Sequence, residues 1–175
     1  MFADLAGGSA ASQESLGSYP LVSRDKTFRP FHGALTSFLH TFVHHVSLSD
    51  TLYCGSNKRT EPSALMAVLQ AWLFTLSHSP LRSFRHTGTV IALDVMTGLV
   101  EALKDVNEEL SVVSRQKESE RKKAGASSRE GKDRIKELDR TMKTVHWKKG
   151  KLEEYLQEFF NTCVAPSPPP LRPAR

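Results

Sequence analysis

The stretch Leu81-Arg82-Ser83-Phe84-Arg85-His86-Thr87 opens the segment that decides the fold. Pro80 precedes it, and proline is favoured where a helix starts because the first N–H groups have no partner inside the helix. Ser79 can supply the N-cap oxygen. Beyond this stretch the apolar residues alternate steps of four and three, at Ala92, Met96, Leu99, Leu103, Val106, Leu110 and Val113. This spacing is a heptad seam, which predicts a long helix rather than a strand.

A second seam follows, with Lys149 as its only polar break. Its apolar positions are Ile135, Leu138, Met142, Val145, Leu152, Leu156, Phe159 and Cys163. Residues 124–128 join the two seams and are rich in Ala, Gly and Ser, which predicts a short loop. Two seams joined by one short loop predict a long antiparallel helical hairpin from about Leu81 to Cys163. We expect Leu99 and Leu103 to lie opposite Leu138 and Met142.

Two shorter amphipathic helices are predicted before the hairpin. The first runs from about Arg29 to Ser47, with one apolar face made of Phe31, Leu35, Phe38, Leu39, Phe42, Val43 and Val46. The second follows Pro62 and carries Leu65, Val68, Leu69, Trp72, Leu73 and Leu76 on one face. We expect Trp72 to lie in the core, with its indole N–H bonded to one partner. The fold class is therefore predicted to be all-α.

The chain is predicted to form one domain with two tails. Residues 1–27 are expected to be a flexible N-terminal tail, which is rich in small residues over positions 1–18 and contains a short extended piece at Tyr19–Val22. Residues 28–164 form the helical domain. Residues 165–175 form a Pro-rich disordered tail. We expect Phe159, Phe160 and Val164 to be partly exposed, because a helix with so much apolar surface usually has more protein after it.

Composition and motifs argue against most enzyme classes. Of the 175 residues 39% are hydrophobic, which is enough for a modest helical core. The sequence has no Gly-rich phosphate loop, no GxSxG motif and no paired acid/base spacing. It also has no signal-peptide pattern and no apolar run near the roughly 20 residues of a membrane span. We expect a soluble intracellular protein that is not an enzyme, has no cofactor or small-molecule substrate and does not contact a membrane.

Metal binding is also not expected. Neither cysteine belongs to a CxxC pair. His40 and His44 are four residues apart, a spacing that can place two imidazoles on one metal ion. No HExxH pattern or nearby acidic or cysteine ligand accompanies them, so surface or half-buried histidines are the favoured interpretation.

Positive charge is concentrated in one segment. Residues 115–151 hold 14 Lys/Arg and 6 Asp/Glu, against 10 and 13 in the remainder of the chain. Such asymmetry indicates a nucleic-acid or acidic partner, and the alternative is a solvated face built from good helix formers. The predicted DNA contacts, near the hairpin tip, are Lys122, Lys123, Arg129, Lys132 and Arg134. No aromatic residues interleave with them, so the expected binding is weak, independent of base sequence and directed at duplex DNA.

The start of the long helix is electrostatically unfavourable. Arg82, Arg85 and His86 lie where the helix dipole prefers negative charge, so either an acidic neighbour compensates for them or they are solvated. Asp94 lies among apolar residues of the same helix. An ion pair with Arg85 or Arg82 is the expected role of Asp94, in preference to catalysis.

The run from Leu81 to Val100 resembles the STAG (stromal antigen) domain of cohesin's accessory subunit. The matching residues are Arg82, Phe84, Arg85, His86, Thr87, Met96, Thr97, Leu99 and Val100. The run Glu118-Ser119-Glu120-Arg121 also fits the family pattern, as do Arg134, Leu138 and Phe160. The resemblance covers about Phe28 to Val164.

The resemblance implies a fold and a role. Such proteins are long, all-helical HEAT-repeat solenoids that bind the kleisin subunit, help to load cohesin on DNA and support sister-chromatid cohesion in the nucleus. In the family many HEAT repeats follow the hairpin, so most of the kleisin contact surface is expected to be absent here. The implied function is a non-enzymatic cohesin scaffold with a basic, DNA-approaching surface. The alternative is a protein-only helical adaptor whose basic hairpin is merely solvated, and whether the chain is a fragment stays open.

Overall fold

The computed structural model describes residues 19–55, 63–123 and 129–164, and within these ranges the chain is helical and contains no strand. The elements are α2 (Phe31–Ser47), the 3₁₀ turn η1 (Asp50–Leu52), α3 (Ala64–Ser77), α4 (Arg82–Lys123), α5 (Arg129–Phe159) and the π-helical turn η2 (Phe160–Val164). The all-α prediction is confirmed. None of the described helices is both long and apolar enough to cross a bilayer.

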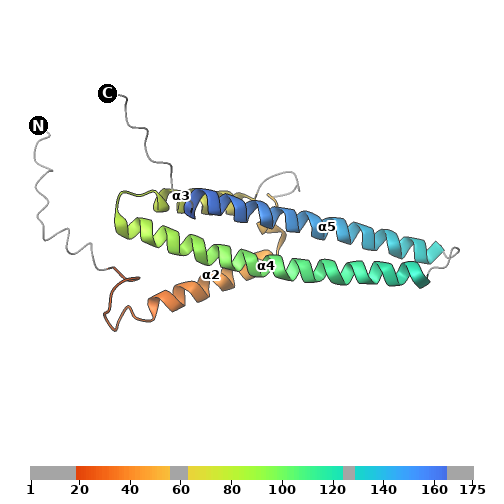
Figure 1. Ribbon diagram of the computed structural model, residues 1–175, viewed down its shortest axis with the longest axis horizontal. Helices are drawn as coiled ribbons and strands as arrows, with labels where there is room; N and C mark the ends of the chain where they lie inside the picture. The colour runs from red at the N-terminus through yellow and green to blue at the C-terminus, as the bar shows by residue number, and fades with distance from the viewer. Residues whose placement is uncertain (1–18, 56–62, 124–128, 165–175) are drawn as a thin grey trace, which may run out of the picture.

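Helices α4 and α5 form the predicted antiparallel hairpin (Figure 1). Helices α2 and α3 pack on α4 at the end of the hairpin away from the connecting loop, and we call this part the body. The other end projects as two helices alone. We define it as the arm, made of residues 111–123 of α4 and 129–144 of α5. The molecule is therefore elongated, with its multi-helix core at one end.

The heptad seam of α4 is confirmed, but it is only part of the buried surface. Ala92, Leu99, Val106 and Val113 are buried, and the remaining seam residues pack partly buried against the core. Val95 and Ala102, which lie off the seam, are also buried. In the body α4 contacts α2, α3 and α5 together, so its buried face is wider than a two-helix seam requires.

The predicted register between the two helices is wrong. The Lys117 ammonium lies 2.5 Å from the Asp139 carboxylate, which fixes the pairing of α4 with α5. Leu103 lies fourteen residues before Lys117, so in an antiparallel pair it lies opposite the turn about fourteen residues after Asp139, near Glu153. Leu138 lies instead opposite the last turns of α4. The error is about two heptads, because a heptad pattern fits equally well after each shift of seven residues.

Glycines allow the close approach of α4 to its neighbours in the body. A Cβ atom at Gly88 would lie 2.7 Å from Cβ of Leu76 and 2.8 Å from the backbone nitrogen of Ser77, at the end of α3. A Cβ atom at Gly98 would lie 3.0 Å from Cβ of Val43 on α2. Real Cβ contacts are rarely so short, so these two glycines set the distance between helices.

Several predicted core residues of α2 and α3 face solvent instead. Trp72 is 69% exposed and Phe38 is 63% exposed, and Val68 and Phe31 are exposed as well. On α3, Met66 and Leu73 are buried. On α2, Leu39 and Val43 are buried. Each short helix meets the hairpin along a narrow stripe, so residues at the margins of its apolar face stay outside.

The segment between α2 and α3 is packed against the core. Leu52 and Tyr53 are both buried, and the Leu52 carbonyl accepts a hydrogen bond of 3.0 Å from the Tyr155 hydroxyl of α5. The Ser63 hydroxyl donates to the Thr51 carbonyl at 2.6 Å and accepts from the Met66 N–H, which caps α3. These bonds tie the loop, which was predicted only as a connection, to α5 and to the start of α3.

The predictions for the ends of the domain are only partly confirmed. Phe160 is 50% exposed and Val164 is half-buried, as expected, but Phe159 is fully buried because it completes the core beneath η2. The piece at Tyr19–Val22 is a turn rather than extended, since the Val22 and Ser23 N–H groups both donate to the Tyr19 carbonyl. The predicted loop at 124–128, the first 18 residues of the predicted flexible tail 1–27 and the predicted disordered tail 165–175 lie outside the described ranges.

Candidate functional site

The first turn of α4 carries the motif that the sequence singles out. The Tyr19 hydroxyl and His86 Nδ1 are hydrogen bonded at 2.5 Å, and the Arg85 guanidinium donates to the Ser79 carbonyl at 3.1 Å. The Ser79 hydroxyl accepts from the Leu81 N–H, just before the helix begins. The motif therefore ties the N-terminal turn and the α3–α4 corner to α4.

The acidic compensation expected at this turn is not found among the described residues. No described carboxylate pairs with Arg82 or Arg85, and both side chains are exposed to solvent. Asp94 does not pair with either arginine, which corrects the prediction; its Oδ2 accepts a hydrogen bond of 2.9 Å from the Thr36 hydroxyl of α2. Asp94 is thus a contact between α2 and α4. In the same motif, Phe84 is exposed.

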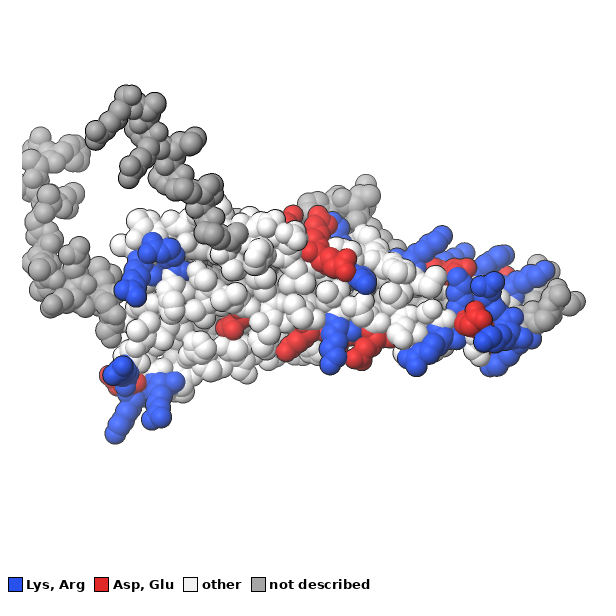
Figure 2. Space-filling model, viewed as in Figure 1, with Lys and Arg blue, Asp and Glu red and all other residues white. Residues whose placement is uncertain are grey.

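Basic side chains gather at the loop end of the hairpin. Figure 2 shows Lys and Arg over most of this end, whereas the middle of the same face carries several Asp and Glu and few Lys and Arg. In the arm the basic residues with described side chains are Arg115, Lys117, Arg121, Lys122, Lys123, Lys132, Arg134, Lys136, Arg140 and Lys143. They come from both helices, so the loop end presents positive charge around the tip.

Many of these cations are paired with carboxylates. In the described part of the arm the ion pairs are Lys117–Asp139, Lys122–Glu118, Lys123–Glu120, Lys136–Asp133 and Arg140–Glu137. Lys122 and Lys123, two of the predicted DNA contacts, are therefore already partnered at 3.7 and 3.5 Å. Sequence counting gives the net charge of the segment but not which charges neutralise one another.

The remaining candidates differ in what surrounds them. Lys132 and Arg134 are exposed and form no ion pair with any described residue. Arg121 shares these properties, and the sequence-based set did not include it. The side chain of Arg129 lies outside the described part. Exposed ion pairs contribute only about 0–1 kcal/mol, so Lys122 and Lys123 can still exchange their partners for phosphate.

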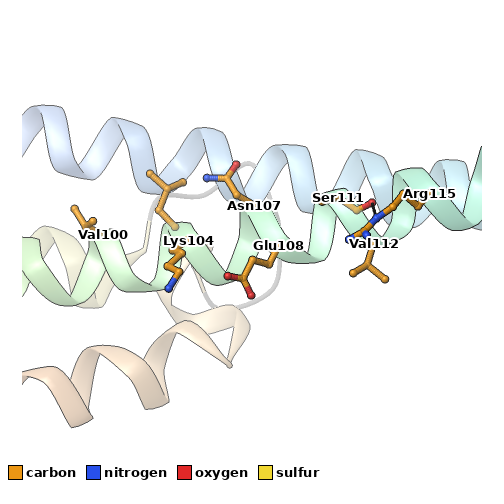
Figure 3. A pocket seen from close by; sticks show the side chains of 8 residues that line it. Val100, Lys104, Asn107, Glu108, Ser111, Val112 and Arg115 are labelled. Atoms are coloured by element: carbon orange, nitrogen blue, oxygen red, sulfur yellow. Dashed lines mark hydrogen bonds between the residues drawn. The ribbon is translucent and has the colours of Figure 1, made fainter.

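A shallow groove of about 590 Å³ runs along α4 (Figure 3). Its lining residues fall in two rows four residues apart on that one helix: Val100, Lys104, Glu108 and Val112, and Leu103, Asn107, Ser111 and Arg115. Val100 and Val112 are exposed apolar residues within it. The groove therefore combines two exposed valines with charged and polar side chains.

A smaller pocket of about 240 Å³ lies where α2, η1, α4 and α5 meet. It is lined in part by Tyr53, Asp105, Glu109 and Lys148. Burial raises the pKa of Tyr53 to about 12, with smaller contributions from the negative charges of Glu109 and Asp50. The Lys148 ammonium lies 3.6 Å from the Asp50 carboxylate and 4.9 Å from the centre of the Tyr53 ring.

His40 and His44 do not converge with a third ligand. His40 Nδ1 lies 3.9 Å from Glu101 of α4, and His40 Nε2 is buried without a hydrogen-bond partner. The ring of His44 instead lies beside that of His45. Within the described ranges no group of three or more His, Cys, Asp or Glu residues is placed to hold a metal ion.

Comparison with known proteins gives one family. A family model described as STAG domain matches residues 17–141. The chain is 31% identical over 153 residues to the cohesin subunit psc3 of Schizosaccharomyces pombe, an alignment that covers 87% of this chain and 15% of that protein. It is 34% identical over 110 residues to the cohesin subunits SA-3 of Mus musculus and Homo sapiens, covering 63% of this chain and 8% of each relative. The chain thus spans only a small part of the length of these relatives.

Proposed function

The chain belongs to the STAG-domain family, and from this premise we propose that it acts as a non-enzymatic scaffold segment of a cohesin subunit. Its partners would be the kleisin and other cohesin subunits, its location the chromatin of the nucleus and its role the support of sister-chromatid cohesion. The match over residues 17–141 and relatives that are named as cohesin subunits support this role. We further propose that the loop end of the arm approaches duplex DNA.

The observation that carries the DNA proposal is the set of unpaired cations at the tip. Arg121, Lys132 and Arg134 are exposed and lack ion-pair partners among the described residues. The arm holds them away from the body, so a duplex can reach them without meeting α2 or α3 (Figure 1). Cations of this kind release counterions from the phosphate backbone when they bind, which gives affinity without base recognition.

The test is a charge reversal with a matched control. We compare the variant Lys132→Glu/Arg134→Glu with Arg24→Glu/Lys26→Glu, which changes net charge equally at exposed sites of the body. Binding to a duplex of random sequence is measured by fluorescence anisotropy at several salt concentrations. The arm variant should lower the slope of log affinity against log salt by about 0.9 for each phosphate that it no longer neutralises. The control should retain most of the wild-type slope.

The two outcomes separate the DNA proposal from its alternative. Equal losses in both variants would mean that only total charge matters and would remove the arm as a site. Affinity that does not change with salt would favour the protein-only adaptor. A specific observation supports that second candidate: the groove along α4 presents Val100 and Val112 in a setting suited to a protein partner. Pull-down of cohesin subunits, weakened by Val112→Glu, would support it.

A further inference from the structure

The pocket at the junction of α2, η1, α4 and α5 carries an inference that does not depend on DNA binding. It lies in the body, and each of its walls comes from a different element. Leu48 at the end of α2 and Val106 of α4 provide apolar walls, and Tyr53, Asp105, Glu109 and Lys148 supply the polar groups. At about 240 Å³ it suits one amino-acid side chain better than a large ligand.

One tyrosine hydroxyl at the pocket has no protein partner in the part of the chain that the structure describes. Tyr53 lines the pocket and is only 1% exposed, yet its hydroxyl forms no hydrogen bond with any described residue. Tyr155, the neighbouring buried tyrosine, does have a partner in the Leu52 carbonyl. The Tyr53 oxygen is not among the described buried side-chain atoms that lack a partner, so it remains accessible from the pocket and is available to a group that enters it.

Two carboxylates of α4 line the same pocket. Asp105 and Glu109 lie one turn apart on the same face of α4, and neither forms an ion pair or hydrogen bond with any residue in the described ranges. Lys148, the cation that lines the pocket, is already engaged by Asp50 and by the face of the Tyr53 ring. The charged lining of the pocket is two carboxylates and one ammonium, and Asp50 outside the lining offsets part of the ammonium charge, so the pocket is negative overall and attracts a cation.

We propose that this pocket binds the side chain of an arginine from a partner protein. A guanidinium presents five donors in a planar fork, which can serve the carboxylates of Asp105 and Glu109 and the oxygen of Tyr53 together. The methylene stem of the arginine lies against Leu48 and Val106. Lysine, with one compact and strongly hydrated ammonium, satisfies fewer of these acceptors and binds more weakly.

The experiment uses the full chain and N-acetyl-arginine methylamide as the probe. Amide chemical shifts are recorded by NMR at constant ionic strength while the probe is titrated into the millimolar range. The corresponding citrulline compound has nearly the same shape without the charge and serves as the ligand control. We expect saturable shifts around Tyr53, Val106 and Glu109 with the arginine probe, smaller ones with the lysine analogue, and none with the citrulline compound.

Three variants locate the site. Glu109→Gln should weaken binding about tenfold, because it removes a charge-assisted pair, and Tyr53→Phe should weaken it about threefold, because only the hydroxyl is lost. Glu108→Gln is the matched control: it removes an exposed carboxylate of α4 that does not line the pocket, and it should leave the affinity unchanged. Tyr53→Phe keeps the buried ring, so the fold is retained while the hydroxyl is tested.

The proposal is overturned if the shifts do not saturate, or if Glu108→Gln and Glu109→Gln weaken binding equally, since either result means general attraction to acidic surface. Equal binding of the arginine and citrulline probes overturns it as well. Sedimentation velocity tests the source of the arginine. Self-association of the full chain that disappears in Glu109→Gln would replace the partner protein with a second copy and overturn that part of the assignment.

Discussion

The body and the arm share the same two helices but are held together by different contacts. Along α4 the buried residues in the body are Gly88, Ala92, Val95, Gly98, Leu99, Ala102 and Val106, whereas the described part of the arm buries only Val113 on this helix. On α5, Leu152, Tyr155 and Phe159 of the body are buried, while Ile135, Leu138 and Met142 of the arm are half-buried. In the arm, the Lys117–Asp139 ion pair contributes a contact between α4 and α5.

The difference shows what a third and fourth helix add to a hairpin. Two helices alone leave each seam residue open to solvent along its flanks, so packing in the arm excludes water only in part. In the body α2 and α3 close those flanks, and the interior becomes sensitive to atomic volume. The arm is consequently the part that tolerates changes of side chain, and its exposed faces are free to carry charge.

The largest expected effect comes from emptying the core of the body. Leu99→Ala should lower the free energy of unfolding by about 3–5 kcal/mol, because it leaves a cavity at a fully buried site. Leu138→Ala, the matched change in the arm, should cost about 1–2 kcal/mol, because a half-buried leucine has less apolar area to return to water. Urea denaturation followed by circular dichroism measures both. Similar costs at the two sites would mean that body and arm are packed alike.

A second pair of variants tests the close approach of α3 to α4. Gly88→Ala should destabilise the protein by about 1–3 kcal/mol, since the new methyl group would meet the backbone at Ser77. Gly150→Ala on α5 adds the same methyl group where nothing lies within 4 Å, and should stabilise the helix by about 0.5–1 kcal/mol. Thermal melts measure the change in melting temperature of each variant, and the two changes should have opposite signs. A stabilising Gly88→Ala would contradict the observed contact with α3.

A third, smaller effect concerns alkaline pH. The pKa of Tyr53 is raised to about 12, so the folded protein keeps this proton where the unfolded chain, with an ordinary pKa near 10, has lost it. The contribution of Tyr53 to stability is therefore complete below about pH 10 and is lost as the pH rises toward 12. The free energy of unfolding of the Tyr53→Phe variant should fall less steeply over this pH range, as measured from the midpoints of urea denaturation. Parallel curves for the two proteins would show that Tyr53 ionises equally easily in both states.

The smallest expected effect lies in the arm. Asp139→Asn removes the ion pair with Lys117 and should change the free energy of unfolding by about 0–1 kcal/mol, since the pair is partly exposed. Added salt should reduce the difference further. Stability measured in low and high salt checks this. A loss as large as that of Leu99→Ala would show that charge, rather than packing, holds the arm together.

The sequence predicted where the helices lie along the chain better than it predicted how they contact one another. The seams of α4 and α5 were visible because heptad spacing is set by contact with a partner helix, and the buried Leu99 and Leu152 lie on them. The register was not visible, since Leu103 fits opposite Leu138 or Leu152 equally well by pattern. Trp72 was misplaced because an apolar face shows which side of a helix is hydrophobic but not how far the neighbouring helices reach across it.

A candidate site could be predicted from the sequence only to the extent that its residues are neighbours along the chain. The basic segment is continuous, so its location at the loop end followed from the hairpin prediction. Which cations pair with glutamates, as Lys122 and Lys123 do, depends on how the side chains are placed. For this reason the sequence did not indicate that Arg121 lacks an ion-pair partner among the described residues. The pocket around Tyr53 and Glu109 gathers residues from four elements, and no spacing along the chain indicates it.

The hydrogen bond from Tyr155 to the Leu52 carbonyl has a consequence for synthesis of the protein. Its two residues are 103 positions apart, and at a translation rate of about 5–20 residues per second the ribosome needs about 5–20 s to pass from one to the other. Leu52 and Tyr53 therefore leave the ribosome before the α5 residues that cover them have been synthesised. Nascent α2 and α3 therefore expose apolar surface until the hairpin is complete, which is the interval in which a chaperone would meet this chain.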